Sequence, residues 1–190
     1  MYDGGTAMKQ FVEKLTLRKV LFFTALFIVM YILINFTPIG VAGLLKITNG
    51  ANILDFEFGY TSDQAYTMIT NLGEDGRSFY LTRIIPLDFP FPFAYMICYV
   101  GWIALLVKNI ASLSVAKYLI LVPFCAMIFD WIENIGIFFI LNTYPELSVM
   151  AVQLASISGI LKILFSMSSI LIIFISLTLY LLQKKRRTRM

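Results

Sequence analysis

The chain contains no histidine among its 190 residues. Histidine is the commonest metal ligand and a frequent general base, so its absence excludes sites that depend on an imidazole. The only two cysteines, Cys98 and Cys125, stand in separate apolar segments and form no C-x-x-C pair. A thiol–disulfide relay would need paired thiols, and we therefore expect both cysteines to be small core residues.

Charged residues and nucleotide-binding motifs are also scarce. Only 14% of the residues are charged, against about a quarter in a typical soluble domain. The sequence holds no Walker A motif and no G-x-G-x-x-G, and it lacks the signatures of the lipid phosphatases and of the CDP-alcohol phosphotransferases. Hydrophobic residues make up 59% of the chain, and its mean hydropathy is +0.84. This composition predicts an integral membrane protein with one domain, residues 1–190, and no nucleic-acid partner.

Four apolar runs are long enough to cross the hydrocarbon core of a bilayer, which takes about 20 helical residues. They cover approximately residues 20–36, 88–107, 118–141 and 157–182, and a longer, more polar segment, 41–87, separates the first two. The first run has the basic flank of a secretory signal, but it is long for one and no A-x-A-like cleavage site follows. The predicted fold is therefore an all-α membrane protein, a bundle of four transmembrane helices.

The distribution of positive charge predicts the orientation of these spans. Eleven basic residues fall in the N-terminal flank, in the loop between the second and third spans and in the C-terminal tail: Lys9, Lys14, Arg18, Lys19, Lys108, Lys117, Lys184, Lys185, Arg186, Arg187 and Arg189. Segment 41–87 has only Lys46, Arg77 and Arg83. We therefore expect a multi-pass protein of the bacterial plasma (inner) membrane, with both termini cytoplasmic and segment 41–87 outside.

Segment 41–87 carries signals for a helical cap on the outer end of the bundle. Thr61 and Gln64 have the spacing of a capping box, and Gly73 is a plausible end for the helix that it starts. A second amphipathic piece, 77–85, is predicted to end before Pro86. Its Arg77, Tyr80 and Arg83 are candidates for binding an anionic headgroup. Pairing with nearby carboxylates or with lipid headgroups is the simpler alternative.

The third span contains Asp130, Glu133 and Asn134, which share one helix face because they lie at i, i+3 and i+4. A lone charge in the hydrocarbon core costs about 2.5 kcal/mol or more, so these groups need a partner, a proton or water. Every other span also has a polar stripe at helical spacing, and the four stripes are expected to face one another. They supply the remaining candidate binding residues: Asn35 in the first span, Asp88, Tyr95 and Tyr99 in the second and Lys162 in the fourth.

The rise of about 1.5 Å per residue places Glu133 and Lys162 at similar depths in the outer half of the bundle. The polar set predicts either an outward-facing pocket or a purely structural network. In a pocket, carboxylates in excess of the one lysine would hold protons or a cation. We expect no metal centre and no cofactor, since three carboxylates on two helices are a weak donor set.

Three functions fit this pattern. The leading one is a pocket that binds a lipid, an amphiphile or a cation. The second is an intramembrane enzyme acting on a lipid-borne substrate, with Asp130 or Glu133 as the acid/base. The third is a membrane scaffold or accessory subunit whose polar network holds helices together. The expected partners are membrane lipids, with a homo-oligomer or a membrane partner protein as a further alternative.

The residues Gly76-Arg77-x-x-Tyr80, Asp88-x-Pro90-x-Pro92-x-x-Tyr95 and Asp130-x-x-Glu133-Asn134 resemble a pattern found in bacterial four-span membrane proteins of uncharacterised activity. The resemblance covers about residues 77–145. It implies the same polytopic architecture and a shared site, and it implies no particular activity.

Overall fold

Helices form all the regular secondary structure in the residues that the computed structural model describes, which are 14–108, 113–146 and 148–187. Four long helical segments are apolar enough to cross a membrane, namely Leu17–Ile47, Gly73–Val107, Val115–Thr143 and Val149–Arg186. For these residues, the prediction of an all-helical fold with four helices long and apolar enough to cross a membrane is confirmed. Lys9 and Arg189, two of the basic residues that predict the orientation of the spans, lie outside the described residues.

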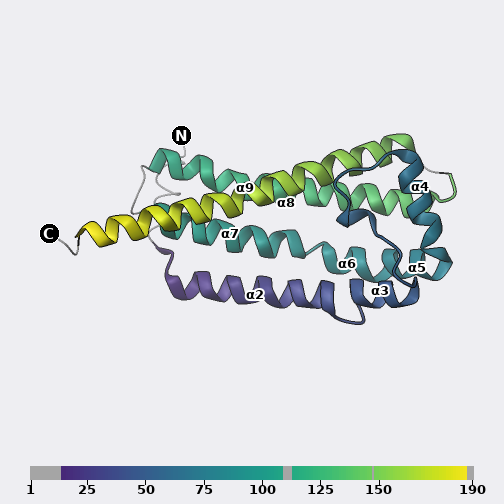
Figure 1. Cartoon of the computed structure of the whole chain (residues 1–190), viewed down its shortest axis with the longest axis horizontal. Coiled ribbons are helices and arrows are strands. Elements are labelled where there is room, and N and C mark those ends of the chain that lie inside the picture. The colour runs from purple at the N-terminus through teal and green to yellow at the C-terminus, as the bar shows by residue number, and fades with distance from the viewer. Residues whose placement is uncertain (1–13, 109–112, 147, 188–190) are drawn as a thin grey trace, which may run out of the picture.

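The bundle is built from the helices α2 (Leu17–Phe36), α7 (Phe91–Val107), α8 (Leu113–Thr143) and α9 (Val149–Arg187). Helix α8 packs most extensively on α9 and also on α7, whereas α2 packs mainly on α7. The first turn of α2 and the last turn of α9 lie at the same end of the bundle (Figure 1). Helix α7 also packs on α9, and large parts of the apolar surfaces of α2 and α9 are exposed.

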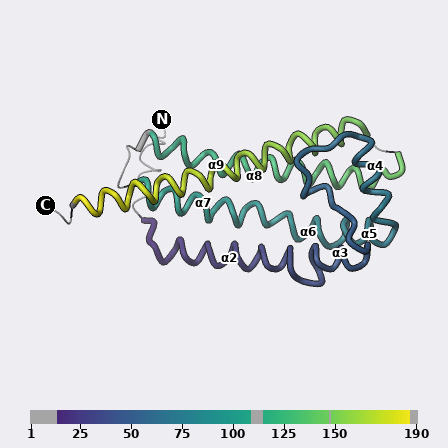
Figure 2. The backbone as a smooth tube through the Cα atoms, in the orientation of Figure 1, coloured from purple at the N-terminus to yellow at the C-terminus, as the bar shows by residue number. Residues whose placement is uncertain are grey.

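The opposite end of the bundle is covered by short helices from the segment between the first two spans (Figure 1). These are α3 (Val41–Ile47), the 3-10 turn η1 (Leu54–Phe56), α4 (Ser62–Asn71) and α5 (Gly73–Phe79). The chain between α3 and α4 crosses this end from the side of α2 toward α9 (Figure 2). The predicted capping box is confirmed, because Gln64 N–H donates to the Thr61 hydroxyl and Thr61 N–H donates to the Gln64 side chain.

The predicted helix boundary at Pro86 is wrong. Helix α5 continues through the π-helical turn η2 (Tyr80–Ile84) into α6 (Ile85–Asp88), which leads to α7. Proline lacks an N–H donor and is tolerated in the first turn of a helix, where no intrahelical partner is needed. The wider turn at η2, where Ile85 N–H donates to the carbonyl of Tyr80, creates such a first turn at Pro86. The second span thus begins earlier than residue 88.

Two apolar clusters hold the bundle together and leave a polar layer between them. At the end that carries the short helices, one cluster joins Leu44, Ile69 and Ile84 to Ile137 of α8. The other cluster packs α2, α7 and α8 near the opposite end and includes Met127 of α8. Along α8, the polar residues 130–134 fall between these two apolar stretches. This placement buries them at mid-bundle, where any unsatisfied polar atom is costly.

Candidate functional site

The polar layer is centred on α8, whose three polar side chains are almost fully buried. Asp130 is 3% exposed, Glu133 is 0% exposed and Asn134 is 1% exposed. The Lys162 ammonium of α9 forms an ion pair with Glu133 and lies 3.9 Å from Asp130 Oδ1. One ammonium therefore bridges two carboxylates on the neighbouring helix, which compensates part of their desolvation.

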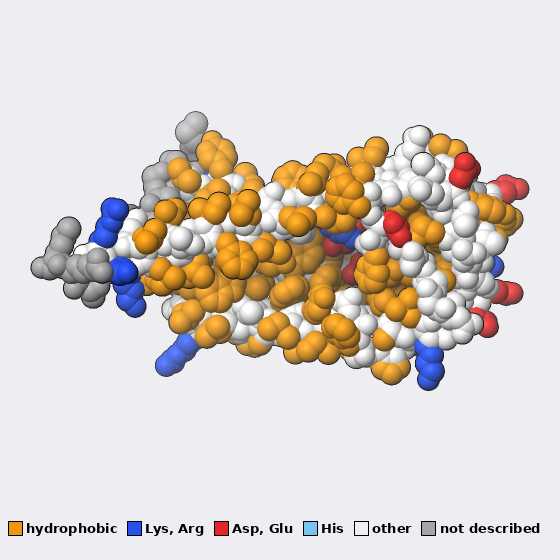
Figure 3. Space-filling view, viewed as in Figure 1, with side chains coloured by type: hydrophobic (Ala, Val, Ile, Leu, Met, Phe, Trp, Pro, Cys, Tyr) orange, Lys and Arg blue, Asp and Glu red, His pale blue; other side chains and the backbone are white. Residues whose placement is uncertain are grey.

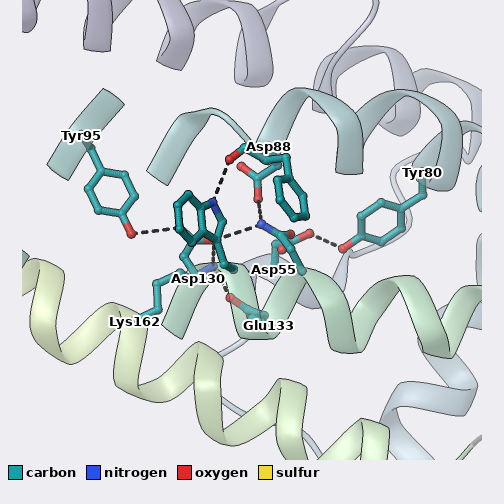
Figure 4. Close-up of polar contacts among 10 residues, drawn as sticks. Asp55, Tyr80, Asp88, Tyr95, Asp130, Glu133 and Lys162 are labelled. Carbon is teal, nitrogen blue, oxygen red and sulfur yellow. Dashed lines mark hydrogen bonds and ion pairs between the residues drawn. The ribbon is translucent and has the colours of Figure 1, made fainter. Parts of the chain in front are cut away.

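Helices α6 and α7 add further polar groups to this layer. The Tyr95 hydroxyl donates to Asp130 Oδ2 at 3.1 Å. The Asn134 amide donates to Asp88 Oδ2 at 2.8 Å and to Asp130 Oδ1 at 3.2 Å. The close-up shows the side chains of Tyr95 and Asp88 pointing toward that of Asp130 (Figure 4). One connected network thus brings together six of the predicted site residues: Asp88, Tyr95, Asp130, Glu133, Asn134 and Lys162.

Asp55, from η1 between α3 and α4, lines the same cavity as Asp88, Asp130 and Lys162, and sequence reasoning missed it. Its carboxylate accepts a hydrogen bond from the hydroxyl of Tyr80, a fully buried residue of η2. The only local signal is its place as a single acidic residue inside the apolar run Ile53-Leu54-Asp55-Phe56. Periodicity cannot place a residue of a single 3-10 turn, so sequence alone could not assign Asp55 to the site.

The segment that carries Asp55 is anchored to α9. The Tyr60 backbone N–H donates to the Ser156 hydroxyl at 2.8 Å. Gly59 just before it has φ +82°, and an added Cβ would lie 2.8 Å from Ile160 of α9. Only glycine meets both conditions without strain or a clash. Burial raises the pKa of the Tyr60 phenol, and the nearby carboxylates of Glu133 and Asp55 raise it further, so this phenol stays protonated.

A cavity of about 310 Å³ borders this network and lies between α2, α7 and α9. The floor of the cavity consists of Asp55, Asp88, Asp130 and Lys162. Its aromatic wall, on α2 and α7, consists of Phe27, Tyr31, Phe91, Tyr95 and Tyr99. Its α9 wall consists of Ile163, Ser166, Met167 and Ile170. In the space-filling view, acidic and basic side chains are visible at the bottom of a hollow that hydrophobic side chains surround (Figure 3).

The other predicted site residues divide between those that line the cavity and those that do not. Asn35 and Tyr99 line it, and the Asn35 amide donates to the Tyr31 carbonyl in its own helix at 2.9 Å. Arg77 does not line it, because its guanidinium lies over the Tyr144 ring at 4.2 Å and donates to the Ile69 carbonyl. Arg83 is exposed and does not line it either. Glu133, Asn134 and Tyr80 do not line the cavity either.

The described part of the chain contains no group of three or more acidic or cysteine side chains arranged to hold a metal ion. Cys98 and Cys125 are not joined to each other. The site can instead offer hydrogen bonds, one ammonium, several carboxylates and aromatic faces to a ligand. Such a site can bind a polar head or move a proton at Asp130.

The four apolar helices indicate a polytopic membrane protein. Beyond that class, comparison with known proteins adds nothing, because no family model, curated protein or solved structure matches the chain.

Proposed function

We propose that this protein binds the polar head of a membrane amphiphile in the cavity between α2 and α9. The observation that carries the proposal is a cavity with a charged floor and an apolar opening at the level of the spans. A purely structural network would be packed without a void, whereas Asp88, Asp130 and Lys162 border open space. Pockets for small ligands typically hold about 300–1,000 Å³, and this cavity falls in that range.

The opening suits a ligand that arrives from the lipid phase. Met167 on α9 is 63% exposed and Tyr31 on α2 is 45% exposed, and both also line the cavity. Side chains that are apolar and exposed at this level would face hydrocarbon once the helices are inserted. A headgroup could therefore reach the floor while its tail stays against α2 and α9.

A catalytic role at the same site is the second candidate, and one contact favours it. Asp130 borders the cavity and accepts a hydrogen bond from Tyr95, so a proton could pass between the carboxyl group and a bound substrate. Glu133 does not border the cavity and would act only through Lys162. Turnover of a bound amphiphile that stops in Asp130→Asn, with binding preserved, would support this role.

The proposal predicts that the purified protein retains a membrane amphiphile and that filling the cavity expels it. Ser166→Phe places a ring in the cavity, and we expect it to remove the bound mass seen by native mass spectrometry. Ser168→Phe is the matched control, because Ser168 lies on the same helix, is exposed and does not line the cavity. A wild-type protein that retains no small molecule and co-purifies with one stable protein would instead support the scaffold function.

We further propose that the protein lies in the bacterial plasma membrane with both termini cytoplasmic and α3–α5 outside. The support is the excess of Lys and Arg at the start of α2, at the end of α7 and the start of α8, and at the C-terminal end of α9. In intact cells, a membrane-impermeant maleimide should label Asn71→Cys of α4, while Gln183→Cys of α9 should react only after permeabilisation. The parent chain, with Cys98 and Cys125, gives the background. Labelling of Gln183→Cys in intact cells would reverse the orientation.

A further inference from the structure

We infer that the amphiphile bound in this cavity carries a cationic head, an ammonium group, and enters sideways between α2 and α9. This inference rests on the proposed binding function and names the chemical class of its ligand. Four features of the cavity favour a cationic amphiphile: the charge of the floor, the unpartnered carboxylate oxygens, the aromatic wall and the apolar opening.

The floor has more negative than positive groups. Three of its four members are aspartates, and the fourth, Lys162, is ion-paired with the buried Glu133. Lys162 supplies the one ammonium on the floor, and Glu133 and Asp130 already share it. The remaining carboxylates need protons or a further cation, because unpaired charges are costly at mid-bundle. A cationic head would supply that charge at the open side of the floor.

Two buried carboxylate oxygens near the floor have no hydrogen-bond donor. Asp55 Oδ1 is unpartnered, although the other oxygen of Asp55 accepts from Tyr80. Glu133 Oε1 is also unpartnered, and its residue is completely buried. Buried acceptors are nearly always satisfied, so the Asp55 oxygen, whose residue lines the cavity, points to a donor that the chain itself does not provide. The N–H groups of a ligand ammonium next to Asp55 would provide it, whereas Glu133 does not border the cavity and is ion-paired with Lys162.

The aromatic wall adds a surface that attracts cations. Phe91 lies 5.8 Å from Phe27 and 5.5 Å from Tyr95, measured between ring centroids, and Tyr95 lies 5.6 Å from Tyr99. The rings form one continuous surface beside the carboxylates, and all of them line the cavity. A cation over the face of an aromatic ring is attracted by its quadrupole, and aromatic cages are used to bind alkylated ammonium groups.

An anionic head fits this site poorly. It would face Asp55, Asp88 and Asp130, and it would have to compete with Glu133 and Asp130 for Lys162. Arg77 and Arg83, the other basic groups considered for an anion, do not line the cavity. Because the α9 wall is largely apolar and exposed, the ligand is an amphiphile rather than a free amine.

The test uses the full chain in an uncharged maltoside detergent and four probes with nearly equal straight alkyl tails and different heads: dodecylammonium, dodecyltrimethylammonium, dodecanol and dodecanoate. We expect both ammonium probes to bind about tenfold or more tightly than dodecanol, and dodecanoate to bind more weakly still. Asp55→Asn and Asp88→Asn should each weaken ammonium binding by about tenfold. Asp63→Asn, at an exposed position of α4, should leave it unchanged.

Tyr31→Leu provides a second route if an aspartate variant fails to fold, because Tyr31 is exposed and should be replaceable. We expect it to weaken the trimethylammonium probe. If all four probes bind equally and Ser166→Phe removes them all, the cavity binds amphiphiles but the cationic head is wrong. If no probe binds and no native amphiphile is retained, the proposed function fails as well. An equal loss in Asp63→Asn would show unspecific charge attraction and overturn the inference.

Discussion

Replacing Lys162 by methionine should lower the free energy of unfolding by about 3–5 kcal/mol, the range expected when one partner of a buried ion pair is removed. Lys162 is the ammonium that Glu133 and Asp130 share, and both carboxylates are buried. Methionine fills most of the lysine volume, so the loss should reflect charge rather than packing. Unfolding in mixed micelles, followed by circular dichroism, measures the change.

A double substitution separates the effect of the unpaired charge on stability from the effect of poorer side-chain packing. Lys162→Met combined with Glu133→Gln removes both members of the ion pair, and we expect it to recover most of the lost stability. Lys46→Met serves as the control, because Lys46 is exposed near the end of α3. If Lys162→Met is as stable as the wild type, the carboxylates do not depend on this lysine for compensation.

Gly136→Ala should cost about 1–3 kcal/mol of stability, although it adds a single methyl group. Helices α8 and α9 approach closely at this residue, where an added Cβ would lie 2.7 Å from the Ala155 Cβ and 3.2 Å from the Ala151 carbonyl oxygen. Neither neighbour is the end of a flexible side chain, so the helices themselves must move apart. Because Glu133 and Lys162 meet across the same interface, the shift should also weaken ligand retention.

Gly101→Ala is the matched control in another span. An added Cβ at Gly101 would lie 3.4 Å from Val20 of α2, an ordinary van der Waals distance. Alanine also has the higher helix propensity, so this variant should be as stable as the wild type or more stable. Equal losses in Gly136→Ala and Gly101→Ala would mean that close α8–α9 packing is not what glycine provides at position 136.

Local patterns in the sequence determined the four apolar helices and the start of α4. Long apolar runs can satisfy their backbone groups in a membrane only as helices, which makes spans readable from composition. The capping box of Thr61 and Gln64 is equally local, because its bonds join residues three apart. The spacing of Asp130, Glu133 and Asn134 predicted one shared helix face, and these residues do lie together in the buried polar layer. By contrast, the π-helical turn before Pro86 has no comparable signal, and the predicted boundary was wrong there.

Only the tertiary structure decided what surrounds that polar face. Asp55 comes to its side from η1, in a segment that is held by Tyr80 and, through Tyr60, by Ser156 of α9. Arg77 turns away from it to lie over Tyr144. The cavity itself exists because α2 packs mainly on α7, which leaves space between α2 and α9. Helical periodicity gives the direction of a side chain from its own axis, whereas these contacts depend on how helices far apart in the chain pack together.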